Sequence, residues 1–385
     1  MTAIASVTTA KSPAAIAMVE VFGDSAAKVV AQIFKTASGR DCPFKQGAIY
    51  TGDIVDEGRI IDNIVAARTG EKSIEISCHG NPLIIEMIMT LLKKQGAQLV
   101  SAEKLIAEKL TAKGIKNSIE QEKEIEKLKA VSLTGIKAIT DSNLSTVAAT
   151  WLENFDSLKI EDIRSQSEEI LAASRSAKYL ITGCKAVIAG PPNSGKSTLL
   201  NSLCGRQKAI VTDVAGTTRD WVSATLKIGE IAVEIFDTAG LDAAIVGTNA
   251  VDAESQKRSI KLLSSCDIVL LVLDSSNTVN GFDFSKITES GKKVIAVLNK
   301  SDITDTSKFN LNFEPDETVN ISALTGEGIE QLSSKMQKLL ASERGEHKVI
   351  CFTDRQVSIL KRLASTNESN EIKELILELV NGKVY

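Results

Sequence analysis

Residues 190–197 read Gly-Pro-Pro-Asn-Ser-Gly-Lys-Ser, the pattern G-x-x-x-x-G-K-S that is typical of a phosphate-binding loop. The apolar run before it predicts a buried strand, and residues 197–203 after it have helical spacing. The glycines let successive N–H groups turn toward one anion, and the helix start adds its positive dipole end. We expect Lys196 to reach the β- and γ-phosphates and the Ser197 hydroxyl to bind Mg2+. The loop residues expected at the nucleotide are Asn193, Ser194, Gly195, Lys196, Ser197 and Thr198.

A second motif, Asp237-Thr238-Ala239-Gly240, follows the strand-like run at residues 233–236. A carboxylate at the end of such a strand can hold Mg2+, usually through water. We therefore expect Asp237 to hold the metal and the Gly240 amide to face the γ-phosphate. Between the two motifs, residues 216–220 read Gly-Thr-Thr-Arg-Asp. Thr218 is our predicted Mg2+ ligand in a switch segment, although a polar loop with local hydrogen bonds would have the same composition.

The third motif, Asn299-Lys300-Ser301-Asp302, follows the apolar run at residues 294–298. Asp302 can accept the two N–H donors on the edge of guanine. Adenine lacks this pair, and an unpaired buried polar group costs about 1–3 kcal/mol, so the motif favours GTP over ATP. We expect Lys300 to pack its stem on the base rather than form a salt bridge. Ser322-Ala323 fits a last guanine-contacting loop, although an ordinary turn at a strand end would look the same.

Together the motifs predict a GTP hydrolase, but one familiar catalytic group is missing. Leu241 follows the second motif where Ras-like enzymes carry a glutamine that orients the attacking water. Leucine cannot orient water, and an arginine finger elsewhere supplies roughly 10³–10⁵ in rate. Another polar group and another cation are therefore expected to fill these roles.

Asn193 and residues 209–220, Ala-Ile-Val-Thr-Asp-Val-Ala-Gly-Thr-Thr-Arg-Asp, are similar to the MnmE (TrmE) family of tRNA-modification GTPases. The resemblance implies a K+ ion near the β- and γ-phosphates in place of the arginine finger. Its ligands would be the Asn193 side chain, the backbone carbonyls of Thr212 and Val214, and Thr217. Oxygen ligands suit such a hard cation. Taken alone, Asn193 could equally be a loop-capping residue.

The resemblance also implies a catalytic glutamate after the second motif. An alignment without gaps puts Asn249 at that position. Alignment on Arg258-Ser259 puts Asp252 there instead, and we prefer Asp252, with Glu254 as the next candidate and Lys196 as the catalytic cation of the loop. The alternative is that these are solvated residues of a switch segment.

Residues 68–82, Arg-Thr-Gly-Glu-Lys-Ser-Ile-Glu-Ile-Ser-Cys-His-Gly-Asn-Pro, are similar to a segment of the family's N-terminal domain. The alternation at residues 74–78 predicts a half-buried strand, after which Asn81 can cap a helix whose first turn suits Pro82. We expect Cys78 and His79 to pack at this junction. The chain has two His and no paired-cysteine spacing that would favour a metal site.

The family binds a tetrahydrofolate derivative in this domain, and the resemblance assigns Glu75 to that site. The other family residues depart from the pattern. Glu20 aligns with the family's arginine, the Phe-Leu-Asn-x-Lys segment is not recognisable in residues 99–118, and residues 380–385 replace the Cys-Ile-Gly-Lys tail. These departures count against folate binding.

The resemblance implies a homodimer, a flavoprotein partner similar to MnmG, and tRNA whose wobble uridine is modified. The alternative is a divergent GTPase switch in ribosome assembly or regulation that has lost this chemistry. A net charge of −4 predicts no broad attraction for RNA, so tRNA would contact a partner or a local basic patch. Six cysteines without regular spacing and no apolar run long enough for a membrane predict a cytoplasmic protein.

The order of patterns predicts an α/β and α architecture. Residues 1–118 mix strands and helices, as in an α+β domain, and the resemblance implies that this domain carries the dimer contact. Residues 119–182 and 341–385 have helical patterning, and residues 120–129 predict a mixed-charge helix exposed on three sides. Residues 183–340 alternate strands and helices, as in a P-loop doubly wound GTPase domain inserted into the helical domain.

Overall fold

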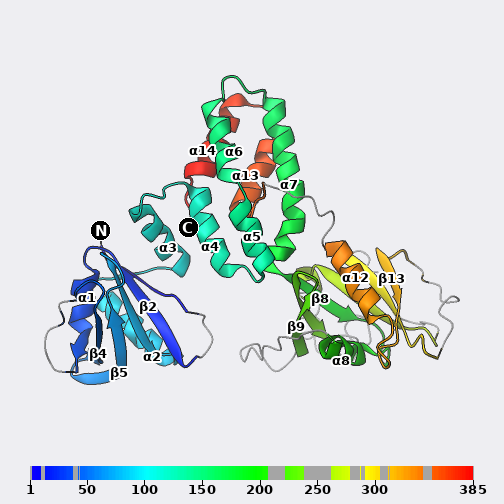
Figure 1. Ribbon diagram of the computed structural model, residues 1–385, viewed down its shortest axis with the longest axis horizontal. Helices are drawn as coiled ribbons and strands as arrows, with labels where there is room; N and C mark the ends of the chain where they lie inside the picture. Colours follow the sequence, from blue (N-terminus) through cyan, green and yellow to red (C-terminus); the bar gives the residue numbers. More distant parts are fainter. Residues whose placement is uncertain are drawn as a thin grey trace, which may run out of the picture. The chain divides into compact units, whose positions relative to one another are not determined.

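The computed structural model describes residues 2–9, 14–37, 42, 44–206, 222–237, 262–277, 287, 291–303, 311, 313–340 and 349–384. The chain divides into two compact units (Figure 1). The first unit is Met1–Ile125 together with Val380–Tyr385, and the second is Glu126–Leu379. The boundaries expected near residues 118, 182 and 340 stay a prediction.

The first unit is built on a seven-stranded sheet with the order β3-β4-β5-β6-β2-β1-β7. Neighbouring strands are antiparallel except for β1 and β7, which are parallel. The strands are β1 (Ile4–Val7), β2 (Ile16–Phe22), β3 (Phe34–Thr36), β4 (Ile49–Asp56), β5 (Arg59–Ala67), β6 (Ser73–His79) and β7 (Gln98–Leu99). Figure 1 shows this sheet with α1 and α2 packed along it.

Alternation along the strands sends two different sets of side chains to the two faces of this sheet. Apolar residues such as Val19, Val21 and Ile76 form the main core with α1 (Ala26–Ile33) and α2 (Pro82–Lys94). Asn81 Oδ1 accepts a hydrogen bond from Leu83 N at 2.9 Å, which confirms the predicted start of α2. The opposite face has a small apolar cluster of Ile4, Phe22 and Leu105, the last from α3 (Ala102–Ala112). It also carries polar side chains.

Helix α4 (Ser118–Lys129) corrects the prediction of a charged helix that is exposed on three sides. Gln121 and Glu122 are 7% and 2% exposed, and Ile119 and Ile125 are buried with them. The Gln121 side chain is buried because its amide donates hydrogen bonds to Thr111 Oγ1 and to the Ile115 carbonyl. The charge pattern alone could not show that these polar groups have internal partners.

The second unit contains a six-stranded sheet with the order β13-β12-β11-β8-β10-β9, parallel except for β9. Residues of β8 and β11 face alternately into two cores, one with α8 and α12 and one on the other face of the sheet. Strands buried on both faces explain the continuous apolar runs in the sequence. The elements are β8 (Cys184–Ala189), α8 (Lys196–Arg206), β9 (Val222–Ile228), β10 (Ile231–Asp237), β11 (Ile268–Asp274), β12 (Lys293–Asn299), β13 (Glu317–Asn320) and α12 (Ile329–Leu340).

Helices precede and follow this sheet in the chain, so the sheet is an insertion within a helical region. They are α5 (Leu133–Asp141), α6 (Leu144–Glu153), α7 (Ile160–Thr182), α13 (Asp354–Ser365) and α14 (Ser369–Asn381). Helix α7 packs against both α5 and α13, which lie on opposite sides of the insertion in the sequence. The predicted fold class is confirmed. In the described part of the chain, each helix is too short or too polar to cross a bilayer.

Two helical glycines predict opposite responses to the same substitution. A Cβ on Gly135 of α5 would lie 2.3 Å from the Leu180 carbonyl oxygen, whereas one on Gly205 of α8 would meet nothing within 4 Å. We expect Gly135→Ala to cost about 1–3 kcal/mol of unfolding free energy through overpacking. Gly205→Ala is the control and should be neutral or stabilise by up to about 1 kcal/mol. Urea unfolding measures both, and an unchanged midpoint for Gly135→Ala would contradict the close helix contact.

Candidate nucleotide-binding site

The phosphate-binding loop connects β8 to α8 and is shaped by two glycines that allow close backbone contact. Gly190 has φ +148°, and a Cβ there would lie 2.1 Å from the Val272 carbonyl oxygen. Gly195 has φ +96°, and a Cβ there would lie 2.1 Å from Asn299 Nδ2. A side chain at either position would therefore separate the loop from β11 or β12.

Three polar side chains converge at the start of α8. Lys196 is 7% exposed, and its Nζ donates to the carbonyls of Gly190 and Pro191 at 3.0 and 2.9 Å. Ser197 Oγ donates to Asp237 Oδ2 at 2.7 Å. Asp237 Oδ1 is buried and has no hydrogen-bond partner among the described residues. A hydroxyl beside a carboxylate oxygen that lacks a partner is a ligand pair that suits a hard divalent cation.

A cavity of about 500 Å3 lies over this loop. It brings together the predicted loop residues and the lysine of the third motif. Asn193, the proposed K+ ligand, lines the cavity with a left-handed backbone at φ +61°. The lining residues are Pro192, Asn193, Gly195, Lys196, Ser197, Thr198 and Lys300. Ser194 of the same loop is fully buried, and its Oγ has no partner among the described residues.

The Asn299 side chain ties the phosphate-binding loop to the predicted guanine loop. Its Nδ2 donates to the Ser194 carbonyl at 2.8 Å, and its Oδ1 accepts from Ala323 N at 2.9 Å. Ser275 Oγ donates to the Asn299 backbone carbonyl at 2.6 Å. Asn299 is 3% exposed, so this amide acts as an internal brace. Ser322 is buried beside it, and Ser322 and Glu327 form a backbone bridge that closes the loop.

Lys300 corrects the prediction that it would not form a salt bridge. Its Nζ lies 2.6 Å from Asp274 Oδ2, with side-chain exposures of 34% and 13%. Asp274 ends β11 directly beside Asn299 in the sheet register. Burial acts to raise the pKa of Asp274, but hydrogen bonds from Lys300, Ser276 and Asn277 outweigh it and lower the pKa to about 2. The lysine therefore faces an ionised carboxylate throughout the neutral pH range.

Asp274 was not predicted from the sequence, although a signal was present. Asp237 and Asn299 each end a buried parallel strand, and Asp274 ends the run at residues 268–273 in the same way. Asp302 lies in the turn after β12 and is exposed rather than buried. Its contribution to base selection therefore depends on a base that packs against it.

Several predicted site residues lie outside the described part of the chain. These are Thr212, Val214, Thr217, Thr218, Gly240, Asp252 and Glu254. Their roles stay predictions.

The first unit places Glu75 directly opposite Glu20 on neighbouring strands. Glu20 is 5% exposed and forms an ion pair with Lys109 of α3. Glu75 Oε1 accepts a hydrogen bond from Thr69 Oγ1 at 3.0 Å. Two carboxylates thus share one row of the sheet, where the family pattern has one carboxylate and one arginine.

His79, which was expected only to pack, has a partner that the sequence did not indicate. Its Nδ1 lies 2.6 Å from Asp62 Oδ1, and its backbone N–H donates to Asp62 Oδ2 at 2.9 Å. The neighbouring Cys78 is buried, and burial, with the Asp62 carboxylate nearby, raises the pKa of its thiol to about 11. This thiol is therefore protonated at neutral pH.

Comparison with known families agrees with this geometry. Residues 185–300 match the family described as "50S ribosome-binding GTPase", and residues 3–104 match that described as "GTP-binding protein TrmE N-terminus". The parallel sheet, the phosphate-binding loop and the Asn299 motif define the class: this chain is a P-loop GTPase, a GTP hydrolase.

Relatives across most of the chain narrow the class to one family. The tRNA modification GTPase MnmE of Clostridioides difficile (strain 630) is 31% identical over 88% of this chain and 81% of its own length. That of Endomicrobium trichonymphae is also 31% identical, over 96% of this chain and 90% of its own. The chain belongs to the MnmE family. Among solved structures, the G domain of the T. maritima FeoB iron transporter is 25% identical over 40% of this chain and 97% of its own, with a TM-score of 0.31.

The Lys300–Asp274 pair predicts an effect on nucleotide affinity. We expect Asp274→Asn to speed GDP dissociation about 10-fold, because a charge-assisted hydrogen bond that positions Lys300 is lost. Lys300→Met should have a similar effect, and the double variant should be no worse than either single variant. Stopped-flow release of a fluorescent GDP analogue measures the rates.

Asp156→Asn is the matched control, because it makes the same change at an exposed position in the second unit. Above the ordinary pKa of 3.8 the pair is fully formed, and it is lost only as pH falls through about 2. Wild-type release should therefore show no step from this group between pH 5 and 8. Additive effects of the two substitutions would show that the residues act separately.

Proposed function

We propose that this protein uses GTP hydrolysis to drive modification of the wobble uridine of tRNA, as a homodimer and with a flavoprotein partner similar to MnmG, in the cytoplasm. One combination of features carries the proposal. A nucleotide site braced by Asn299 and a segment that matches the TrmE N-terminus occur in one chain, and relatives named tRNA modification GTPases align with both.

In the hydrolysis step, water attacks the γ-phosphate and GDP leaves with inorganic phosphate as the second product. Lys196 is placed to neutralise charge on the phosphates once it exchanges its contacts with the loop carbonyls for phosphate oxygens. Ser197 and Asp237 fit Mg2+, because a buried Asp237 oxygen without a partner lies beside the Ser197 hydroxyl. Thr218 would complete this set. The ion would supply positive charge at the β- and γ-phosphates.

We propose K+ as the second cation, held by Asn193, the carbonyls of Thr212 and Val214, and Thr217. Asn193 supports this, because it lines the cavity beside Lys196 and has an amide oxygen that suits a hard cation. The ion would supply the charge that an arginine finger supplies elsewhere. Asp252, with Glu254 as the alternative, would orient the attacking water in place of the glutamine that Leu241 replaces.

The sheet face of the first unit that carries Glu20 and Glu75 does not fit a tetrahydrofolate derivative. A carboxylate such as Glu75 could pair with a pterin ring, but folates also carry carboxylates of their own. The neighbouring position holds the buried Glu20, and the nearby cation Lys109 already pairs with it. Two carboxylates in one row would repel an anionic ligand. We therefore derive no step that uses folate.

This same pair of carboxylates favours the alternative function. A chain without a folate site could retain GTP-driven movement as a regulatory switch, for instance in ribosome assembly, without modifying a nucleoside. The two functions differ in whether the wobble uridine of tRNA is modified.

The cation site predicts a salt-specific rate. GTP turnover should be at least about 10-fold faster in KCl than in NaCl, because K+ fits the oxygen ligands and supplies part of the effect of an arginine finger. Asn193→Ala should remove the difference and leave the Na+ rate unchanged. Phosphate release at equal ionic strength measures both. Equal wild-type rates in the two salts would reject the K+ site.

The modification role predicts a nucleoside change in cells. Deletion of the gene should increase the fraction of unmodified wobble uridine, and the wild-type gene should restore the modification. A Lys196→Ala variant should not restore it, because it cannot neutralise the phosphates. Mass spectrometry of nucleosides from purified tRNA measures this. Unchanged nucleosides in the deletion strain would favour the regulatory switch.

A further inference from the structure

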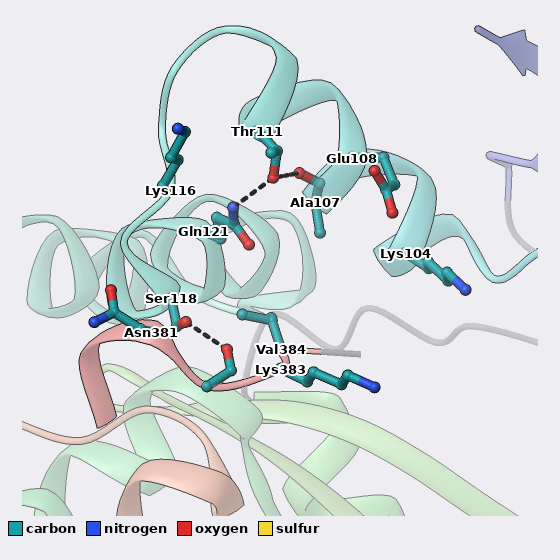
Figure 2. A pocket seen from close by; sticks show the side chains of 11 residues that line it. Lys104, Ala107, Glu108, Thr111, Lys116, Ser118, Gln121, Asn381, Lys383 and Val384 are labelled. Carbon is teal, nitrogen blue, oxygen red and sulfur yellow. Dashed lines mark hydrogen bonds between the residues drawn. The ribbon is translucent and has the colours of Figure 1, made fainter. Parts of the chain in front are cut away.

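The first unit contains a polar pocket that the nucleotide chemistry does not use. It has a volume of about 250 Å3 and lies between α3, the start of α4 and residues 381–384 (Figure 2). Ser118 Oγ donates to the Gly382 carbonyl at 2.5 Å, so the C-terminal segment forms one wall. Thr111 Oγ1 donates to the Ala107 carbonyl and accepts from Gln121, which fixes the opposite wall.

The floor of the pocket has an acceptor without a partner. Gln121 is 7% exposed, and both hydrogens of its amide are used by Thr111 Oγ1 and the Ile115 carbonyl. Its Oε1 accepts no hydrogen bond from the described residues, and Figure 2 shows this oxygen on the pocket side. This amide oxygen is open to the pocket, so it can accept a hydrogen bond from a bound molecule.

The walls carry a positive charge excess. Lys104, Lys116 and Lys383 line the pocket with one carboxylate, Glu108, which gives three positive charges against one negative, or +2. None of these four side chains forms an ion pair with another described residue. A chain with a net charge of −4 thus concentrates cations in one hollow of one unit.

This pocket is separate from the row of Glu20 and Glu75. Lys104, Glu108 and Thr111 are spaced by four and three residues, so they share one face of α3. Lys109, which pairs with Glu20, and Leu105, which packs on the sheet, lie on another face. The repulsive carboxylate row therefore does not face a ligand in the pocket.

We propose that this pocket binds one nucleotide unit of an RNA strand, with the phosphate on the lysines and a ribose hydroxyl or base N–H group on Gln121 Oε1. The volume is too small for a whole drug-sized ligand but suits one unit of a longer polymer. Lysine ammonium groups bind phosphate, and an amide acceptor in the pocket can bind the 2′-OH that distinguishes RNA from DNA. The inference rests on the proposed function, because it makes tRNA the source of the strand.

The experiment measures binding of full-length protein to a tRNA transcript by fluorescence anisotropy at several KCl concentrations. The variant K104Q/K116Q/K383Q should weaken binding at least about 10-fold at low salt. It should also reduce the slope of log affinity against log salt by about 0.7–0.9, since the contact with one phosphate is lost. The matched control is K28Q/K35Q/K45Q, which removes the same charge from exposed positions on α1, β3 and the loop before β4. The control should bind almost normally.

Two single variants test the pocket further, and the first should change tRNA affinity in the opposite direction. Glu108→Gln removes the one carboxylate and should tighten tRNA binding, which damage to the fold would not do. Gln121→Glu turns the acceptor into a charge and should weaken binding at every salt concentration. Equal affinity of wild type, triple variant and Glu108→Gln would overturn the proposal, as would a wild type that does not bind the transcript.

Two further measurements are needed. One distinguishes binding of an RNA strand from binding of a free mononucleotide, and the other tests the proposed function separately from the pocket. Uridine monophosphate, which has no guanine edge for the nucleotide site, is titrated alone. Tight binding of this mononucleotide with no effect of the triple variant on tRNA would overturn the RNA assignment. Wobble nucleosides of the deletion strain test the proposed function separately. Unchanged nucleosides with lysine-dependent tRNA binding would reject the modification role and leave the pocket standing.

Discussion

The nucleotide site depends on one buried amide. Asn299 holds the phosphate-binding loop through the Ser194 carbonyl and the guanine loop through Ala323 N, so two parts of the site that are far apart in sequence share one brace. A buried amide that lost either partner would leave a backbone group unpaired, at about 1–3 kcal/mol. Gly195 is fixed by the same contact, because any side chain there would displace the Asn299 nitrogen. A structural change in the phosphate-binding loop should therefore also alter the guanine loop, and the reverse.

Around this brace, the polar residues of the nucleotide site lie at the carboxyl ends of four parallel strands. Strand β8 leads into the phosphate-binding loop, β10 ends at Asp237, β11 ends at Asp274 and β12 ends at Asn299. In an open parallel sheet, loops at this edge come from different parts of the sequence but meet in space. Asp274 and Lys300 extend the arrangement, because an ion pair between adjacent strand ends fixes a long, flexible side chain beside the base site.

The sequence predicted the parts of the site whose spacing is local, and missed the partners that only the fold brings close. The phosphate-binding loop and the Asn299 motif each sit at the end of an apolar run, so their positions followed from strand patterning. Lys300 was expected to pack on the base rather than form a salt bridge. Its partner, Asp274, is 26 residues away in the chain, and no local pattern indicates the pair. The sequence likewise did not indicate that Lys109 pairs with Glu20 or that Asp62 pairs with His79, because both pairs are distant in the chain. In α4, charge patterning predicted exposure, but burial of Gln121 depends on α3. A periodic pattern shows which face is apolar, and it does not show which polar groups find partners.

The hydrogen bond between Ser118 and Gly382 joins residues 264 positions apart, and this separation has a consequence during synthesis. A ribosome releases α3 and the start of α4 early, long before residues 381–384 exist. Ser118 therefore has no partner at Gly382, and stays solvated, while the inserted sheet and the helices of the second unit are translated. Only then can the pocket wall that contains Gly382 dock. The first unit therefore completes its folding only after residues 381–384, the last described segment, have been synthesised. A nascent chain stalled within the nucleotide-binding region would carry a sheet that is already paired beside a corner that is still open.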